Sequence, residues 1–129
     1  MDSSTLSPVR LANRRDFYAA VDAAAASGRA WTVVLLDLDR FGCVNARYGW
    51  EAGDAVLQTV AERLARCVDP GDTVVRTGGD EFGVLVTWAG DPDVAGLALQ
   101  IISTVEERID VTGGTVEVGC TIGIGSAAP

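Results

Sequence analysis

The chain has 129 residues, of which 48% are hydrophobic and 22% are charged, and this is the composition of one globular domain. Its formal net charge is −8, all ten basic residues are arginine, and it contains no histidine. This balance argues against DNA or an anionic membrane as a partner. It also excludes imidazole catalysis and the lysine-containing Walker phosphate loop.

Seven elements are predicted from hydrophobic periodicity and turn residues. They are a helix at about 13–27, a strand at 31–38, a helix at about 52–68, strands at 73–77 and 82–88, a helix at 92–109 and a strand at 115–124. The apolar run at 31–38 is typical of a strand buried on both faces. Asp91 is the expected N-cap of the last helix. Residues 1–10 are expected to be loosely ordered, and 11–129 to form one domain.

Compartment and redox state follow from what the chain lacks. No apolar run approaches the roughly 18 residues of a membrane span, and the first residues do not form a signal peptide. We therefore expect a cytoplasmic protein. Cys43, Cys67 and Cys120 are too widely spaced for a disulfide framework or a zinc ribbon, so reduced and mostly buried thiols are expected.

After the first helix, the element order is βαββαβ, which predicts an α+β fold of the ferredoxin-like or palm type, with an antiparallel sheet flanked by helices. In this topology the first and third core strands are antiparallel neighbours. Asp37 and Asp39 end the first of these strands, and Asp80 and Glu81 lie in the turn before the third. The topology therefore predicts that the two acidic pairs face each other.

Carboxylates that converge without histidine or cysteine make an all-oxygen site, which suits Mg²⁺ or Mn²⁺. Magnesium sites combine one or two carboxylates with substrate phosphates, so a nucleoside triphosphate is the expected substrate. The structural alternative is that Asp37 and Asp39 only end a strand and that Gly78 and Gly79 only form a hairpin turn. Both motifs occur together in the expected order of elements, and this favours the functional interpretation.

The stretches from Asp37 to Asp54 (DLDRFGCVNARYGWEAGD) and from Arg76 to Phe82 (RTGGDEF) closely resemble the GGDEF family of diguanylate cyclases. LANRR at 11–15 and CTIGIG at 120–125 resemble two further family motifs, so the likeness runs from about residue 11 to residue 125. The resemblance implies the nucleotide cyclase fold. It also implies bacterial signalling, in which a homodimer condenses two GTP molecules into cyclic di-GMP.

The resemblance also implies roles for individual residues. Asp37, Asp80 and the Leu38 backbone carbonyl would bind the metal, and Asp80 and Glu81 would be catalytic. Asn45 and Asp54 would bind guanine. Phe41, Gly42, Gly78 and Gly79 would approach the phosphates.

The sequence departs from the family pattern at several points, which makes it a short and partly divergent member. Gly42 stands where the family usually has lysine, and the usual helix after the last strand is missing. Asp69 stands where the family's inhibitory product site has arginine, so no such site is expected. The alternative function is therefore a degenerate GGDEF domain that binds GTP or a protein partner without turnover. A related cyclase with another product is the third possibility, and a sensory or regulatory partner is possible in each case.

Other residues receive structural interpretations. Trp31, Trp50 and Trp88 are expected to pack in or beside the core. Arg14 and Arg15 are expected to be solvated, and Arg76 is expected to pair with a carboxylate near the turn.

Overall fold

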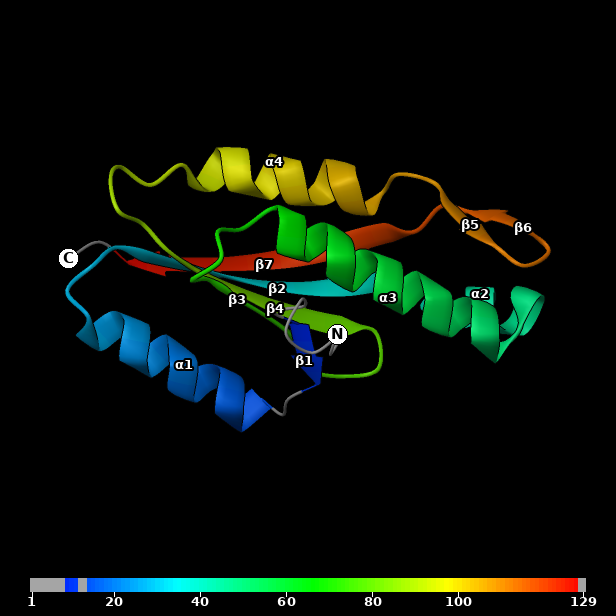
Figure 1. Ribbon diagram of the computed structural model, residues 1–129, viewed down its shortest axis with the longest axis horizontal. Helices are drawn as coiled ribbons and strands as arrows, with labels where there is room; N and C mark the ends of the chain where they lie inside the picture. Colours follow the sequence, from blue (N-terminus) through cyan, green and yellow to red (C-terminus); the bar gives the residue numbers. More distant parts are fainter. Residues whose placement is uncertain (1–8, 12–13, 128–129) are drawn as a thin grey trace.

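The computed structural model describes residues 9–11 and 14–127. Eleven elements follow one another in this part of the chain (Figure 1). They are β1 (Val9–Leu11), α1 (Arg14–Ala26), β2 (Trp31–Asp39), α2 (Phe41–Tyr48), α3 (Trp50–Arg66), β3 (Thr73–Arg76), β4 (Glu81–Thr87), α4 (Val94–Val105), β5 (Ile109–Val111), β6 (Gly114–Val116) and β7 (Gly119–Ala127). The seven predicted elements are present, and β1, α2, β5 and β6 are additional.

The main sheet has five strands in the order β1-β3-β4-β2-β7. β2 pairs antiparallel with β4 on one side and with β7 on the other, whereas β1 runs parallel to β3. The predicted α+β fold and the predicted central pair are therefore confirmed. Because β2 is the middle member of three long strands, its last residues lie between the β3–β4 turn and the start of β7.

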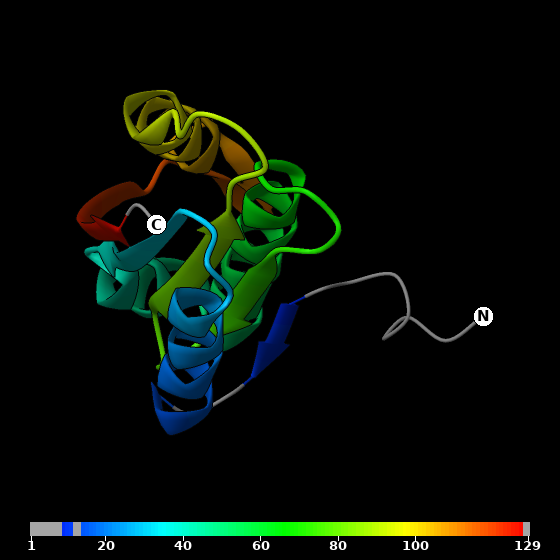
Figure 2. The same cartoon turned by 90° about the vertical axis from the view of Figure 1, so that its left-hand side faces the viewer.

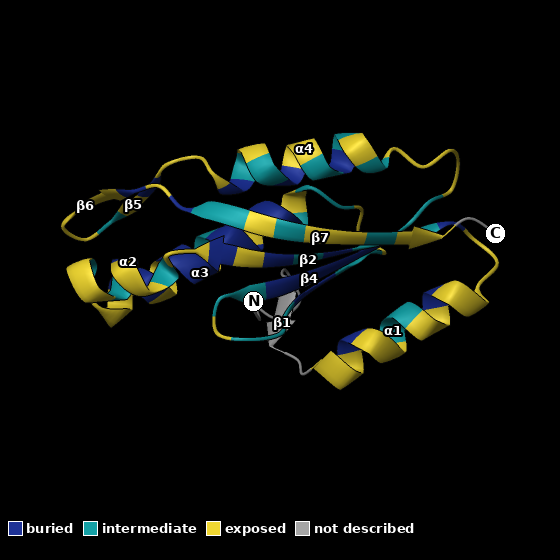
Figure 3. Ribbon diagram, turned by 180° about the vertical axis from the view of Figure 1, so that it is seen from behind, coloured by how far each residue is buried: buried dark blue, intermediate teal, exposed yellow. Residues whose placement is uncertain are grey.

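Helices cover the two faces of the sheet unequally (Figure 2). Along β2, Thr32, Val34, Leu36 and Leu38 are buried and pack on the side of α3 and α4. The alternate residues Trp31, Val33 and Leu35 are only half-buried and pack against a smaller cluster under α1. The prediction that both faces of this strand are buried is therefore wrong for the α1 face, because α1 is the only described helix on it (Figure 3).

The larger core lies between the sheet and the pair α3 and α4. The apolar face of α3 is buried at Val56, Leu57, Val60 and Leu64. α4 begins three residues after the predicted cap, since the Asp93 carboxylate, not that of Asp91, accepts a hydrogen bond from the Gly96 amide.

α4 ends at Val105, earlier than predicted, and the chain then forms the β5–β6 hairpin. The buried guanidinium of Arg63 on α3 accounts for this end. It donates hydrogen bonds to the main-chain oxygens of Val105 (3.4 Å), Glu107 (2.7 Å) and Arg108 (2.7 Å). A charged donor thus satisfies carbonyl groups that a helix end leaves without partners. Apolar periodicity predicts a helix as far as residue 109, because Ile109 continues the apolar pattern. In the structure Ile109 is buried as a residue of β5 instead.

α1 docks on the sheet through one close contact. The Phe17 ring is buried against Gly83 of β4, where a Cβ atom would approach ring carbons to 2.8 Å.

Among the described residues, no helix is both long and apolar enough to span a membrane.

Candidate functional site

The site predicted from the acidic pairs lies where β2 ends beside the turn between β3 and β4. Asp37 is the direct cross-strand partner of Glu81, and the Leu38 amide donates a 3.0 Å hydrogen bond to the Asp80 carbonyl oxygen. The Leu38 side chain is buried in the core, so only its main chain is available at this edge. The predicted proximity of Asp37 to Asp80 and Glu81 is therefore confirmed.

Asp39 behaves differently from Asp37. Its carboxylate accepts a 2.8 Å hydrogen bond from the Thr121 hydroxyl on β7, and it lies against Gly119. The expectation that Asp39 faces the second acidic pair is wrong, because β7 offers its carboxylate a hydroxyl donor on the other side of β2.

The carboxylates concentrate negative charge at this edge. Desolvation raises the pKa of Asp37, and the neighbouring Glu81 and Asp80 carboxylates raise this pKa further, while Arg14 opposes the shift. Repulsion of this kind disfavours the charged carboxylate. A bound cation would relieve it.

Glu81 already has two partners within the protein. The Arg14 guanidinium donates to both carboxylate oxygens, at 2.9 Å to Oε2 and 3.0 Å to Oε1. The Thr77 hydroxyl donates to Oε1 at 2.8 Å. Arg14 is exposed, as expected, but its guanidinium also pairs with Glu81. This contact arises because the start of α1 lies over the start of β4, which sequence periodicity could not reveal.

A metal ion fits this site only if phosphate oxygens of a bound substrate complete its coordination. In the part of the chain that the structure describes, no group of three or more acidic, cysteine or histidine side chains is arranged to hold a metal. Magnesium commonly uses one or two carboxylates together with phosphate oxygens and water. Asp37, Asp80 and the Leu38 carbonyl fit that mode of binding, with Glu81 held by Arg14.

The β3–β4 turn is closed by main-chain and arginine contacts. The Arg76 Nε group donates to the carbonyl oxygens of Gly78 and Gly79, both at 3.1 Å, and the Thr77 amide donates to the Glu81 carbonyl at 2.9 Å. The predicted pairing of Arg76 with a carboxylate is therefore wrong, since the turn's carbonyl oxygens are its acceptors. Neither glycine has a positive φ, so the backbone conformation of the turn does not require glycine.

Gly79 nevertheless has an open surface. A Cβ atom there would meet nothing within 4 Å, and one at Gly78 would make only an ordinary 3.4 Å contact with Glu81. No described neighbour therefore requires glycine at either position. Glycine at both positions leaves room for another molecule to approach the backbone closely.

The predicted guanine-binding pair lies at the corner between α2 and α3. Gly49, with a φ of 94°, joins the two helices, and its amide donates to the Asn45 carbonyl oxygen. The Asn45 side-chain oxygen is buried without a hydrogen-bond partner among the described residues. It lies over Gly53, where any Cβ atom would overlap it, while Asp54 is exposed on the next position of α3. The corner thus places a buried, unpartnered amide oxygen next to an exposed carboxylate.

Phe41 and Gly42 form the first turn of α2. Arg40 precedes them in a left-handed conformation with a φ of 59°, and no side chain caps the helix. Phe41 is half-buried against the main core, and Gly42 is exposed. Uncapped amides at a helix N-terminus can donate hydrogen bonds to an anionic ligand.

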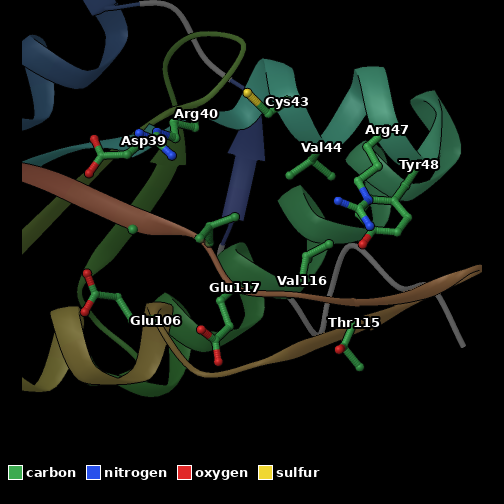
Figure 4. Close-up of a pocket in the computed structure, with 12 residues that line it drawn as sticks. Asp39, Arg40, Cys43, Val44, Arg47, Tyr48, Glu106, Thr115, Val116 and Glu117 are labelled. Atoms are coloured by element: carbon green, nitrogen blue, oxygen red, sulfur yellow. The ribbon is translucent and has the colours of Figure 1, made fainter.

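A cleft of about 690 Å³ lies on the other side of α2, facing β6 and β7 (Figure 4). Arg40, just before α2, and Arg47 on α2 line one wall of it, and Glu106 and Glu117 line the opposite wall. Of the two acidic pairs it includes only Asp39, so this cleft adjoins the predicted site without containing it. Sequence reasoning missed this cleft, because one wall is the β5–β6 hairpin.

A second cleft, of about 300 Å³, adjoins the loop at 69–72 where the family's inhibitory site was sought. Asp72 accepts hydrogen bonds there from the main-chain amides of Asp69 (3.0 Å) and Thr87 (3.2 Å). Its carboxylate therefore holds the loop against the end of β4, and Asp69 and Asp93 add negative charge to the cleft.

The three tryptophans and the three cysteines divide by exposure. Trp31 and Trp88 are half-buried, as expected, and the Trp88 indole donates to the Thr32 hydroxyl at 2.9 Å. Trp50 is 76% exposed at the start of α3, so the packing prediction is wrong for this residue. All three cysteines are free thiols, but Cys43 is exposed and none is fully buried.

A palm-type sheet with an acidic edge and a helix corner defines a nucleotide cyclase fold, and comparison with known proteins identifies the family. Residues 2–129 match the family described as "Diguanylate cyclase, GGDEF domain", so the chain belongs to the GGDEF family. The GGDEF domain of PA1120 (TpbB or YfiN) from Pseudomonas aeruginosa has a similar structure. The TM-score is 0.77 at 36% identity, over 88% of this chain and 70% of that chain.

Curated relatives are much longer. The chain is 33% identical over 123 residues to the bifunctional diguanylate cyclase/cyclic di-GMP phosphodiesterase MucR of P. aeruginosa, covering 95% of this chain and 18% of the relative. It is 37% identical over 98 residues to the diguanylate cyclase DgcZ of Escherichia coli, covering 75% of this chain and 33% of the relative. The similarity supports a place in cyclic di-GMP signalling, and some relatives are named as phosphodiesterases.

Proposed function

We propose that this domain condenses two GTP molecules into cyclic di-GMP, with Mg²⁺ or Mn²⁺ and as a homodimer. The observation that carries the proposal is the β2–β4 register, which sets Asp37 opposite Glu81 and ties Leu38 to Asp80. Asp37, Asp80 and the Leu38 carbonyl would hold the metal ion, which when bound stabilises the attacking and leaving oxygens of phosphoryl transfer.

The other residues bind and orient the nucleotide in this proposal. Asp54 accepts hydrogen bonds from the N1–H and amino groups of guanine, a donor pattern that adenine lacks. Asn45 contributes its unpartnered side-chain oxygen. The first amides of α2, at Phe41 and Gly42, face the phosphates, which also approach the open backbone of Gly78 and Gly79.

One feature favours the binding-only alternative. The family's phosphate-facing lysine is Gly42 here, while Arg14 is engaged with Glu81 and Arg40 lines the neighbouring cleft. Fewer cations near the triphosphate mean weaker stabilisation of its charge. A domain of this kind could bind GTP, or a regulatory protein partner, without turnover.

Mass spectrometry separates the two functions. The chain is incubated with GTP and Mg²⁺ or Mn²⁺ at a concentration that favours dimers, beside Asp80→Asn and a control, Asp110→Asn. Asp110 is exposed on the β5–β6 hairpin, which contributes none of the proposed metal or guanine ligands, so the control removes the same charge outside the site. Product from the wild type and the control, but not from Asp80→Asn, supports the cyclase. Calorimetric GTP binding without product supports the binding module.

Base recognition has its own pair of variants. Asp54→Asn should weaken GTP binding at least tenfold, since it removes a charged acceptor, whereas Glu51→Gln on the same helical turn should not. Tighter binding of ATP than of GTP by the wild type would contradict the guanine assignment. Added cyclic di-GMP should not inhibit turnover, because the Asp72 carboxylate already accepts hydrogen bonds from the Asp69 and Thr87 amides.

A further inference from the structure

The contact between Arg14 and Glu81 joins the first residue of α1 to the first residue of β4 across 67 positions of sequence. Its geometry is a fork, because Nε and Nη2 of the arginine reach the carboxylate at 2.9–3.2 Å. The Arg14 side chain is 65% exposed, whereas that of Glu81 is only 17% exposed. The arginine therefore reaches in from the surface to a carboxylate that is largely enclosed.

The fold fixes this contact through the packing of α1. Phe17 lies one helical turn after Arg14, and Gly83 lies two residues after Glu81 on the same face of β4. The Phe17 ring is buried directly on Gly83. A helical spacing of three thus matches a strand spacing of two. Any slide of α1 along β4 that moved Phe17 from Gly83 would also separate Arg14 from Glu81.

We propose that Arg14 is a positioning residue, which holds the Glu81 carboxylate in place beside Asp37 and Asp80 and links the seating of α1 to the acidic edge. The proposal rests on the proposed function of that edge. Through this link, a change in α1 would reach the site without any movement of the sheet. Without Arg14, the Thr77 hydroxyl would still donate to Oε1 of Glu81, but Oε2 would have no donor among the described residues.

The test compares Arg14→Gln and Arg14→Lys with Arg15→Gln. Arg15 is exposed on the next position, and no ion pair among the described residues includes it, so this control removes the same charge from the same helix. Arg14→Gln should lower kcat about 10- to 100-fold with KM for GTP changed less than about threefold, because a displaced group affects the reacting geometry. Lysine should restore activity only in part, since it cannot form the fork.

A second readout does not depend on turnover. Calorimetric titration with Mn²⁺ should show about three- to tenfold tighter binding to Arg14→Gln, because Glu81 loses its partner and the site loses a positive charge. A purely structural role would not tighten metal binding. The unfolding midpoint should stay close to that of the wild type, since a half-exposed ion pair contributes little to stability.

The outcomes distinguish the two proposals. A wild type without product whose Arg14→Gln variant still binds Mn²⁺ more tightly supports the positioning role and contradicts turnover. Equal kcat and equal Mn²⁺ affinity for the Arg14 and Arg15 variants overturn the positioning role while leaving the cyclase intact. A wild type that neither binds Mn²⁺ nor makes product overturns both.

Discussion

The contact between Phe17 and Gly83 allows a quantitative test of how α1 is seated. In Gly83→Ala, the new methyl group would lie 2.8–3.0 Å from three carbons of the Phe17 ring, which is 1% exposed and so has little room to move. Overpacking of a core typically costs about 1–3 kcal/mol. Alanine in a strand recovers roughly 0.5–1 kcal/mol of backbone entropy relative to glycine. The net expectation is a loss of about 1–2 kcal/mol.

Urea unfolding and thermal melting measure this loss. A domain of this size should lose roughly 3–10 °C in Tm for that change in free energy. The matched control is Gly123→Ala on β7, where a Cβ atom would meet nothing within 4 Å. This variant should be neutral or more stable by about 0.5 kcal/mol, since only the entropy gain remains.

A double-mutant cycle identifies the cause. Phe17→Ala alone should cost about 3–5 kcal/mol, but it removes the ring that the Gly83→Ala methyl group would strike. The double variant should therefore be more stable than the sum of the two single losses predicts. Gly83→Ala with wild-type stability, or strictly additive losses, would refute this account of how α1 is seated.

The remaining predictions concern other parts of the fold. Arg63→Met should reduce the free energy of unfolding by about 2–4 kcal/mol, because it leaves buried carbonyl oxygens after α4 without donors. Urea unfolding measures this loss, and the control Arg66→Met, at an exposed position of the same helix, should not show it. Equal losses for both variants would mean that Arg63 does not hold the end of α4. Burial, with Glu106 and Asp39 adding to it, raises the pKa of the Cys120 thiol to about 11 from 9.0. Since the thiolate is the nucleophile, iodoacetamide should modify exposed Cys43 well before Cys120 at pH 8, by peptide mass mapping. Because the folded-state pKa is raised, the stability contributed by Cys120 is present below pH 9 and is lost as the pH rises towards 11, a loss that Cys120→Ala should remove.

Sequence patterns were sufficient for the parts of the fold that depend on local chemistry. Apolar periodicity predicted α3, and the order of elements placed β2 beside β4. The meeting of Asp37 and Glu81 could therefore be predicted from the sequence. Motif spacing also indicated the GGDEF family. These features follow from side-chain periodicity and from the order of elements, both of which can be read directly from the sequence.

Only the tertiary structure decided which partners the polar groups take. Asp39 turns to Thr121, Arg76 binds the glycine carbonyls of its turn, and Arg14 holds Glu81. Each of these choices depends on which donors and acceptors surrounding elements bring within about 3 Å, and the sequence carries no local signal for such distances. The acidic edge was therefore predictable from the order of the strands, whereas the arginine that holds its glutamate appeared only when α1 was seated on the sheet.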